Sequence, residues 1–304
     1  MTLFQRVEEL TVTSQNSSKK SIGEFVLRKK SHVSEYTTQQ IADETYTSKA
    51  ALVRFAKALG YQGWKEFAGA FAAEQHYQES HYSDIDPNFP FTGDDTISDI
   101  IRKMSSLQVE SILDTADLLN PHTMKKAADL LVKSRRTALF GMNPNILVGE
   151  LFQRRMMTIG KQVEIPLRND SGLLASSLTG EDCAILISYS GNTETREPVN
   201  LLPILESRQV PVIAITSMGN NKLRMHARYT FSISSREKLY SKISTFATEK
   251  SVEFILDILF SACFSLSYQE NLNTKIRNGK ALEGARIATN EDLAEKQPEQ
   301  ERQI

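Results

Sequence analysis

Cysteine and histidine are scarce in this sequence, and neither is arranged as a covalent framework or a metal site. The 304 residues contain two cysteines, Cys183 and Cys263, and five histidines that form no cluster. Both cysteines stand in apolar stretches, where a small thiol is usually a buried core residue. Two such cysteines cannot build a disulfide framework, and their spacing is not that of metal ligands. We therefore expect no disulfide bond, no bound metal and no cofactor.

Long apolar segments are also absent. The most apolar stretch, residues 252–268, is interrupted by Glu253 and Asp257, so it does not predict a membrane-spanning helix. The first residues do not show a charged segment followed by an apolar one, which is the pattern of a secretory signal. The sequence thus predicts a cytoplasmic protein with no membrane partner.

An excess of charge of one sign is missing as well. Lys and Arg number 36 against 37 Asp and Glu, a net charge of −1, so the chain is not cationic throughout. The local balance is different, because nine basic and four acidic side chains lie between Lys19 and Lys65. Any contact with nucleic acid must therefore come from this patch.

The length of the chain suits two domains, and the spacing of apolar residues changes along it. Residues 1–77 have helical spacing and predict an all-α domain, whereas residues 78–106, rich in proline and aspartate, predict a linker. Residues 107–280 alternate helices with short apolar runs, which predicts an α/β domain with a doubly wound, five-stranded parallel sheet. Residues 281–304 predict a polar, disordered tail. The predicted strands are Thr137–Gly141, Gln162–Ile165, Cys183–Ser188, Pro211–Thr216 and Tyr229–Ile233.

The segment Thr38–Gly60 has the spacing of two short helices joined by a tight turn at Thr45–Thr47. In the second helix the apolar stripe faces inward, which leaves Lys49 and Lys57 on one solvent-facing line. A helix that enters the major groove of DNA needs such cations for the phosphates. On pattern and charge alone, DNA binding and the ordinary surface of a small helical bundle are equally supported.

Residues 48–63, SKAALVRFAKALGYQG, resemble the helix-turn-helix signature of the RpiR family of bacterial transcriptional regulators. The family pattern, Ser-x-Ala-Thr-Ile-x-Arg-Phe followed by Leu-Gly and an aromatic residue, matches in register. Two positions depart from it: Ala51 replaces a threonine, and Tyr46 stands where the turn usually has glycine, which requires a strained or altered turn. The resemblance implies binding to double-stranded operator DNA. The predicted DNA-binding residues are Thr38, Gln39, Thr47, Ser48, Lys49, Ala50, Arg54 and Lys57.

Two of these residues have a second interpretation. Ser48 can cap the second helix as well as contact DNA. Arg54 precedes a core phenylalanine, where it can pair with Asp43 or Glu44 and join the two helices instead of contacting a phosphate. Lys49 and Lys57 are therefore the better candidates for phosphate contacts.

A cluster of hydroxyl side chains follows the most apolar predicted strand. The segment Ile187–Thr193, ISYSGNT, places Ser188, Ser190 and Thr193 around a glycine, and we expect a helix to begin directly after it. Free N–H groups at a helix start favour an anion, and ligands of open α/β sheets bind beyond the carboxyl ends of the strands. An ordinary strand-to-helix turn, in which Thr193 only caps the helix, explains the same spacing.

This segment resembles the Ser-x-Ser-Gly-x-Thr signature of the SIS (sugar isomerase) domain, which is the ligand domain of RpiR-type regulators. The resemblance covers residues 124–266. It implies that Ser188, Ser190 and Thr193 hold the phosphate of a phosphorylated sugar, and that Gly191 and Asn192 offer backbone N–H groups to it.

The loop after the first predicted strand departs from the SIS pattern Gly-x-Gly-x-Ser. Asn143 occupies the second glycine position and Asn145 the serine position, where its amide can still donate to a phosphate or a sugar hydroxyl. In SIS domains a later segment often closes over the ligand, which adds Thr248 and Glu249 to the predicted binding residues. Because this loop is altered, a sensor domain that no longer binds sugar is a further alternative.

The residues do not favour catalysis. Sugar-phosphate isomerases need a base beside the carbonyl, and the nearest acids, Glu150 and Glu249, stand in helical segments where acids are mostly solvated or paired. His226 is a lone histidine before a predicted strand. We therefore predict a regulator, not an enzyme, that binds operator DNA and a sugar-phosphate effector as a homodimer or homotetramer. A sugar-phosphate isomerase with a helical appendage is the alternative from another class.

Overall fold

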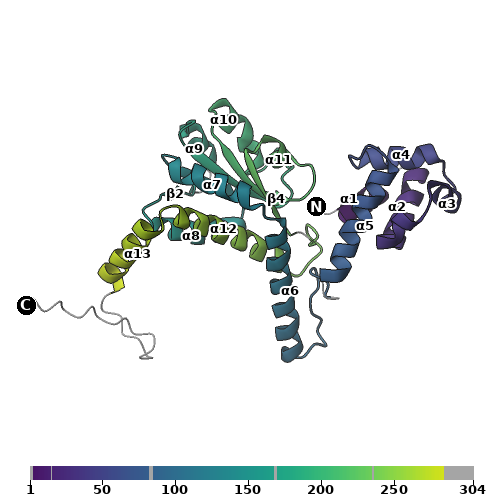
Figure 1. Ribbon diagram of the computed structural model, residues 1–304, viewed down its shortest axis with the longest axis horizontal. Coiled ribbons are helices and arrows are strands. Elements are labelled where there is room, and N and C mark those ends of the chain that lie inside the picture. Colours follow the sequence, from purple (N-terminus) through teal and green to yellow (C-terminus); the bar gives the residue numbers. More distant parts are fainter. Residues whose placement is uncertain (1–2, 15, 82–84, 168–169, 235, 284–304) are drawn as a thin grey trace, which may run out of the picture.

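The computed structural model describes residues 3–14, 16–81, 85–167, 170–234 and 236–283, which form two parts joined by a connector (Figure 1). An all-helical part comes first in the chain, and an α/β part follows it. This is the order of fold classes that the sequence predicts.

The N-terminal part buries one apolar stripe from each of several helices. Its core includes Ile22, Phe25, Phe55 and Phe67, each at most 1% exposed. The rings of Phe55 and Phe67 meet edge to face with their centroids 5.7 Å apart, a favourable aromatic geometry. The elements of this part are α1 (Leu3–Thr13), α2 (Ser17–Lys29), the 3₁₀ helix η1 (Lys30–Glu35), α3 (Thr38–Glu44), α4 (Lys49–Ala58) and α5 (Trp64–His81).

Local signals define the ends of α3 and α4. Thr37 and Gln40 form a capping box at the start of α3, in which Thr37 Oγ1 accepts the Gln40 N–H at 3.2 Å. Gly60, with a φ of +89°, lies just beyond the last residue of α4, where a left-handed residue commonly ends a helix. The two helices of the predicted helix-turn-helix are therefore bounded by their own caps.

The connector between the two parts is shorter than the linker predicted at residues 78–106. Helix α5 continues to His81, and α6 (Ile97–Leu118) already begins at Ile97. Thr96 explains the early start of α6, because its Oγ1 accepts the N–H of Asp99 at 3.2 Å while the Asp99 carboxylate accepts the Thr96 N–H. Residues 85–96 are the described non-helical part of the connector.

The C-terminal part contains a five-stranded, all-parallel sheet in the order β2-β1-β3-β4-β5. Three strands have the predicted bounds, β2 is shorter, and β4 is shifted by one residue. Because nearly every residue of β1, β3 and β4 is buried, these strands are continuous apolar runs of the kind that sheets covered on both faces require. The strands are β1 (Thr137–Gly141), β2 (Val163–Glu164), β3 (Cys183–Ser188), β4 (Val212–Ser217) and β5 (Tyr229–Ile233).

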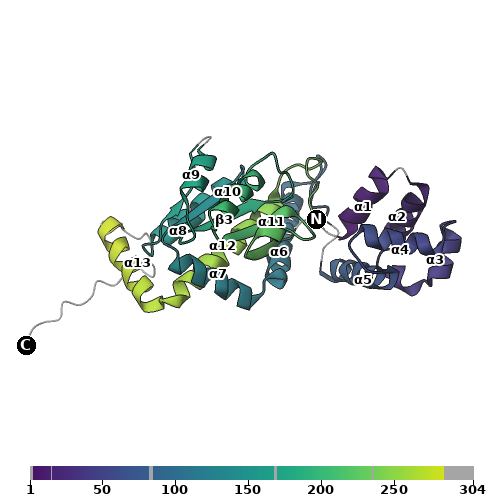
Figure 2. The same cartoon turned by 90° about the horizontal axis from the view of Figure 1, so that it is seen from above.

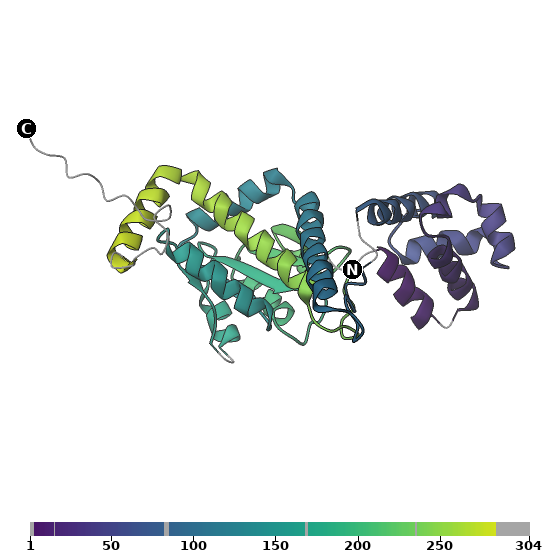
Figure 3. The ribbon, with the colours of Figure 1, turned by 90° about the horizontal axis from the view of Figure 1, so that it is seen from below.

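Helices cover both faces of the sheet (Figure 2). Ile185 of β3 packs in the core beneath α7, α8 and α12, whereas its neighbour Leu186 packs on the opposite face with α9, α10 and α11. Figure 3 shows the long helix α12 crossing the first of these faces. The helices are α7 (Pro121–Lys133), α8 (Asn145–Met157), α9 (Ser171–Ser177), the 3₁₀ helix η2 (Val199–Leu201), α10 (Leu202–Ser207), α11 (Lys222–His226) and α12 (Phe246–Leu266).

Helix α12 bends by 106° into α13 (Tyr268–Glu283), which has no buried side chain and extends away from the domain in Figure 1. Residues 281–283 of the predicted tail form the last turn of α13, and residues 284–304 lie outside the described residues. In the part of the chain that the structure describes, no single helix combines the length and apolar character needed to cross a membrane. Only α12 and α13 taken together, across their bend, pass that test.

Both cysteines lie in the core between the sheet and α12, where Cys183 and Cys263 are at most 1% exposed. Burial raises the pKa of each thiol to about 12. At pH 8 roughly one such thiol in 10⁴ is ionised, against about one in four at an ordinary pKa of ~8.5. We therefore expect neither thiol to react with a chromogenic disulfide reagent in the native protein, and both to react in guanidinium chloride. Rapid reaction of either thiol under native conditions would contradict this placement.

Candidate functional site

Helix α4 presents the predicted DNA contacts on its exposed face. It buries Leu52 against the helical core and leaves Lys49, Ala50, Arg54 and Lys57 exposed. Three cations on one short helix, with a small residue at its first turn, suit close approach to DNA and contacts with its phosphates. The predicted amphipathic character of this helix is confirmed.

The turn before α4 contains an exposed aromatic residue that the sequence analysis treated only as a turn position. Tyr46 adopts a left-handed conformation, with a φ of +52°, and is 97% exposed. The hydroxyls of Thr45 and Thr47 lie 2.8 Å apart, and Ser48 caps α4 by accepting the Ala51 N–H at 3.2 Å. The strained turn expected for a non-glycine residue is therefore present, and Tyr46 is a further candidate for contact with DNA.

Helix α3 carries the remaining predicted DNA contacts. Thr38 is half-buried, and Gln39 is exposed, with its amide donating to Asp43 Oδ1 at 2.8 Å. Glu44 forms an ion pair of 2.7 Å with an arginine of α2. The two acids considered as partners of Arg54 are thus engaged by other side chains, while Arg54 itself is exposed. This arrangement favours a phosphate contact for Arg54 over a role in joining the two helices.

Two predicted ligand loops leave the same edge of the sheet. The strand register pairs Gly141 of β1 with Ile187 of β3, so the loops that follow these strands begin side by side. A Cβ added at Gly141 would lie 3.1 Å from the Ile187 carbonyl oxygen and 3.6 Å from the Cβ of Asn145, the first residue of α8. Glycine therefore lets the first loop approach the third strand closely. Asn143 lies exposed in this loop, and Asn145 is half-buried.

Gly191 makes the turn in the loop after β3. It has a φ of +62°, and its N–H donates to Ser188 Oγ at 3.3 Å. A Cβ at this position would lie 2.5 Å from Oδ1 of Asn221. Asn192 anchors the loop to α11, because its Oδ1 accepts the Lys222 N–H at 3.1 Å. The loop that contains the predicted phosphate contacts is thus held in one shape by its own residues and by α11.

The helix expected directly after Thr193 is not there, which corrects the prediction. Residues 189–198 are not helical, and the next helical residues belong to η2 and α10. Pro198 explains the delay, since a residue that precedes proline is disfavoured in helical conformation. Helices α8, at Asn145, and α11, at Lys222, do begin at this edge of the sheet. Of the two loops, the one after β1 is therefore followed directly by a helix start, which favours an anion, and the one after β3 is not.

The hydroxyls of Ser190 and Thr193 are the available donors of the loop after β3. Across the described residues, neither side chain has a hydrogen-bond partner within the protein, whereas Ser188 already accepts from Gly191. Ser190 is half-buried and Thr193 is exposed. A hydroxyl can donate or accept and rotates to suit its partner, which fits the oxygens of a phosphate.

The two residues predicted on α12 are engaged by protein groups. Thr248 is buried and donates to Glu237 at 2.7 Å, and Glu249 accepts a hydrogen bond from the Thr245 hydroxyl. Glu237, which is 1% exposed, also accepts the Ala247 N–H at 2.7 Å. Its carboxylate thus occupies the start of α12, where the helix dipole and free N–H groups stabilise negative charge. Glu237 is a site residue that the sequence does not predict, because it stands in no recognisable pattern.

The other titratable residues considered for catalysis are spread over the domain. Glu150 is exposed on α8, and the His226 imidazole contacts the Glu206 carboxylate at the surface. Among the residues that the structure describes, no group of three or more His, Cys, Asp or Glu side chains could hold a metal ion.

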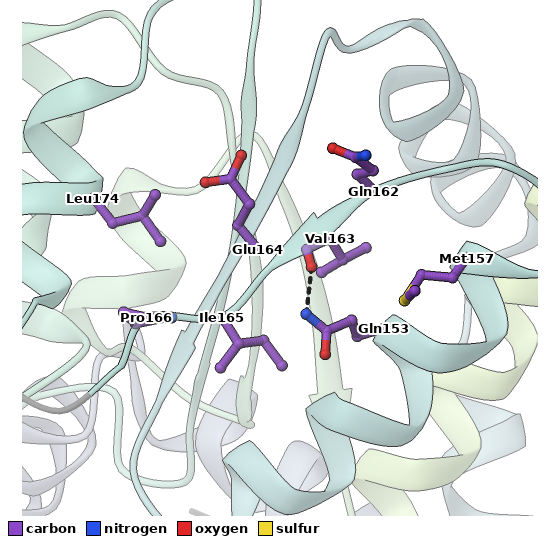
Figure 4. Close-up of a pocket in the computed structure, with 8 residues that line it drawn as sticks. All are labelled: Gln153, Met157, Gln162, Val163, Glu164, Ile165, Pro166 and Leu174. Carbon is purple, nitrogen blue, oxygen red and sulfur yellow. Dashed lines mark hydrogen bonds between the residues drawn. The ribbon is translucent and has the colours of Figure 1, made fainter.

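Two surface depressions lie apart from the loops after β1 and β3. One, of about 470 Å³, borders the edge strand β2, where Gln153 of α8 donates to the Val163 carbonyl at 2.6 Å (Figure 4). The other, of about 490 Å³, is an apolar groove between α6, α7 and α12 that includes Met124, Phe254 and Ile258. None of the predicted binding residues lines either depression.

Comparison with known proteins matches both parts of the chain. Residues 3–78 match the helix-turn-helix domain of the rpiR family, and residues 130–255 match the SIS domain. A Haemophilus influenzae protein named as an uncharacterized HTH-type transcriptional regulator is 25% identical over 249 residues, which cover 82% of this chain and 85% of that protein. Both resemblances predicted from the sequence are confirmed.

Solved structures share the fold. NanR of Vibrio vulnificus, solved in complex with ManNAc-6P, aligns with a TM-score of 0.58 and 19% identity over 94% of this chain and 100% of that chain. The sugar isomerase domain of an RpiR transcription factor from Sphaerobacter thermophilus aligns with a TM-score of 0.52 and 14% identity, over 60% of this chain and 99% of that one. These similarities confirm an α/β domain of the SIS type behind the helical domain.

Proposed function

We propose that the chain, which matches the helix-turn-helix domain of the rpiR family and the SIS domain, is a DNA-binding transcriptional regulator of carbohydrate metabolism. A phosphorylated sugar bound in the SIS domain modulates its affinity for operator DNA. The observation that carries this proposal is the meeting of two polar loops at one edge of the sheet, set by the Gly141–Ile187 register. The regulator acts in the cytoplasm and has no membrane partner.

In the proposed effector site, Ser188, Ser190 and Thr193 hold the phosphate, and Gly191 and Asn192 lie beside them in the same loop. The free hydroxyls of Ser190 and Thr193 support this role. On the facing loop, Asn143 and Asn145 contact the sugar, and the positive end of the α8 dipole favours the anion. Thr248 and Glu249 of α12 border the site.

In the proposed DNA complex, α4 lies in the major groove. Lys49, Arg54 and Lys57 contact phosphates, as their exposure on one helix supports. Thr38 and Gln39 at the start of α3 contact the backbone. Two copies bind half-sites about 34–36 Å apart, so the regulator is a homodimer or a pair of homodimers.

A panel of sugar phosphates tests the effector site, and N-acetylmannosamine 6-phosphate is a natural member because NanR was solved with ManNAc-6P. An effector present at ~100 times its Kd stabilises the folded domain by about 2.7 kcal/mol, which raises the Tm by roughly 5–10 °C. We expect the Ser190→Ala/Thr193→Ala variant to lose this rise, because both free hydroxyls are removed. Thermal unfolding with and without each sugar phosphate is the measurement.

Thr195→Ala provides a matched control, since Thr195 is exposed in the same segment but lies outside the Ser-x-Ser-Gly-x-Thr signature. It is expected to keep the full rise in Tm. If no sugar phosphate stabilises the wild-type protein, the sensor domain is vestigial. If the double variant responds like the wild type, the phosphate is held elsewhere.

We further propose that the protein does not isomerise the sugar phosphate it binds. The Glu249 carboxylate is engaged by Thr245, and Glu150 is exposed, so neither is placed as a desolvated base. Incubation of the protein with the same panel, followed by separation of aldose and ketose phosphates, tests this. Turnover that disappears in Glu249→Gln would establish an isomerase instead.

A further inference from the structure

Asn88, a buried residue of the connector that is 6% exposed, fastens the connector to the SIS domain. Its Oδ1 accepts the Lys238 N–H at 2.6 Å, and its carbonyl oxygen accepts the Ile243 N–H at 2.9 Å. Its Nδ2 donates to the Arg236 carbonyl at 3.5 Å and to Asp86 Oδ1 at 2.9 Å. We name the three hydrogen bonds between Asn88 and residues 236–243 the Asn88 clasp.

The segment 236–243 also contacts the loop that contains the proposed phosphate ligands. Tyr189, which stands between Ser188 and Ser190, donates its hydroxyl to the carbonyl oxygen of Glu237. Lys242 lies over the Tyr189 ring, with its Nζ 5.5 Å from the ring centre. The same segment therefore borders the effector loop on one side and holds the connector on the other.

A single peptide group bonds both to Tyr189 of the effector loop and to Asn88 of the connector. The carbonyl of Glu237, which accepts from Tyr189, and the N–H of Lys238, which donates to Asn88, belong to the same planar unit. Because that unit is rigid, a rotation that follows a displacement of the Tyr189 hydroxyl also turns the Lys238 N–H away from Asn88. The two hydrogen bonds cannot move independently.

The side chain of Glu237 gives this peptide group a fixed resting position. Its carboxylate is buried and accepts hydrogen bonds from the Ala247 N–H and the Thr248 hydroxyl, each at 2.7 Å. It also forms an ion pair of 3.3 Å with Lys242. A buried carboxylate with this many partners resists displacement, because moving it exposes several donors without partners. The segment is thus suited to two discrete arrangements and not to gradual drift.

We propose that the Glu237–Lys238 peptide group is the joint through which effector binding is transmitted to the connector and, by way of α5, to the DNA-binding domain. The inference rests on the proposed function, in which Ser188 and Ser190 bind the phosphate. Drawing these serines toward the phosphate moves Tyr189 between them, turns the peptide group and opens the Asn88 clasp. The effector and DNA then influence each other by the same coupling free energy.

Hydrogen exchange of the full-length protein measures directly whether the Asn88 clasp is closed. The N–H groups of Lys238 and Ile243 are protected by Asn88, so their exchange reports whether the clasp is closed. We expect the panel sugar phosphate that raises the Tm most to increase exchange in peptides covering residues 236–244, whereas inorganic phosphate at equal concentration changes it less. Unchanged exchange at saturation with that sugar phosphate would overturn the joint.

Two variants test whether the joint carries the coupling. Tyr189→Phe removes only the hydroxyl that contacts Glu237, and Asn88→Ala removes the side-chain half of the clasp. Controls of matched chemistry are Tyr240→Phe, with Tyr240 87% exposed, and Asn200→Ala, an exposed position of η2. For each protein the Kd for the sugar phosphate and the Kd for a duplex from upstream of its own gene are measured, the latter with and without the sugar phosphate.

We expect the effector to change the DNA Kd of the wild type and both controls by at least about fivefold, and that of Tyr189→Phe and Asn88→Ala by less than about twofold. The Kd of the two test variants for the sugar phosphate stays within about threefold of wild type, since the phosphate contacts are retained. Full coupling in Tyr189→Phe would overturn the proposal even if Asn88→Ala fails to fold. If no sugar phosphate changes the Kd of the wild-type protein for DNA, that result would instead contradict the proposed function.

Discussion

Removing the two lysines on the outer line of α4 is expected to weaken DNA binding about 10- to 100-fold at ~0.1 M salt. Lys49 and Lys57 stand eight residues apart on one exposed face, so each can neutralise a phosphate of the same duplex. Each lost contact should also lower the slope of log K against log salt by about 0.9, since fewer counterions are released. Fluorescence anisotropy of the Lys49→Ala/Lys57→Ala variant over a salt series measures both quantities.

Charge removal alone must be separated from loss of contact. Lys275 and Lys280, both exposed on α13, allow a control with the same change in net charge, Lys275→Ala/Lys280→Ala. This control should keep the wild-type slope. Exposed lysines contribute little to folding, within about 0.5 kcal/mol, so neither variant should unfold. Equal slopes in both double variants would mean that DNA does not contact this face of α4.

The sheet could be predicted closely because its signal is local. Strands β1 and β3 are short, largely apolar runs, and burial on both faces requires that composition along the strand. The bounds of Thr137–Gly141 and Cys183–Ser188 therefore followed from the sequence. Edge strand β2 was predicted too long, because a strand paired on one side ends where its neighbour's hydrogen bonds end, and apolar residues can continue beyond it.

Features that depend on contacts between distant residues could not be predicted in the same way. Glu237 is an unremarkable acid in the sequence, yet it lies buried at the start of α12 and joins Tyr189, which is 48 residues earlier. The missing helix after Thr193 has a visible local cause in Pro198, but a hydroxyl-rich segment after a buried strand by itself predicts a helix start. The connector was predicted too long because the capping box at Thr96 was not recognised.

Replacing Gly191 by alanine is expected to destabilise the SIS domain strongly. At a φ of +62° an L-residue costs about 1–2 kcal/mol, and overpacking a buried site costs about 1–3 kcal/mol more. The new Cβ would lie 2.5 Å from Asn221 Oδ1 and 2.6 Å from Thr216 Oγ1, and both neighbours are buried. Together these terms lower the stability of the domain by about 2–5 kcal/mol and its Tm by roughly 4–20 °C, measurable by calorimetry.

A second glycine provides the control that separates a loss of stability caused by this loop from the effect of glycine substitution in general. Gly172 lies in α9, and a Cβ added there meets nothing within 4 Å. Gly172→Ala should therefore stabilise the domain slightly, by about 1 kcal/mol, because alanine is the better helix former. Since Gly191 also positions the Ser188–Thr193 loop, whatever folded protein remains in Gly191→Ala should lose the sugar-phosphate response. Comparable Tm values for the two variants would show that the loop tolerates a side chain at Gly191 and is not the tightly packed turn on which the proposed effector site depends.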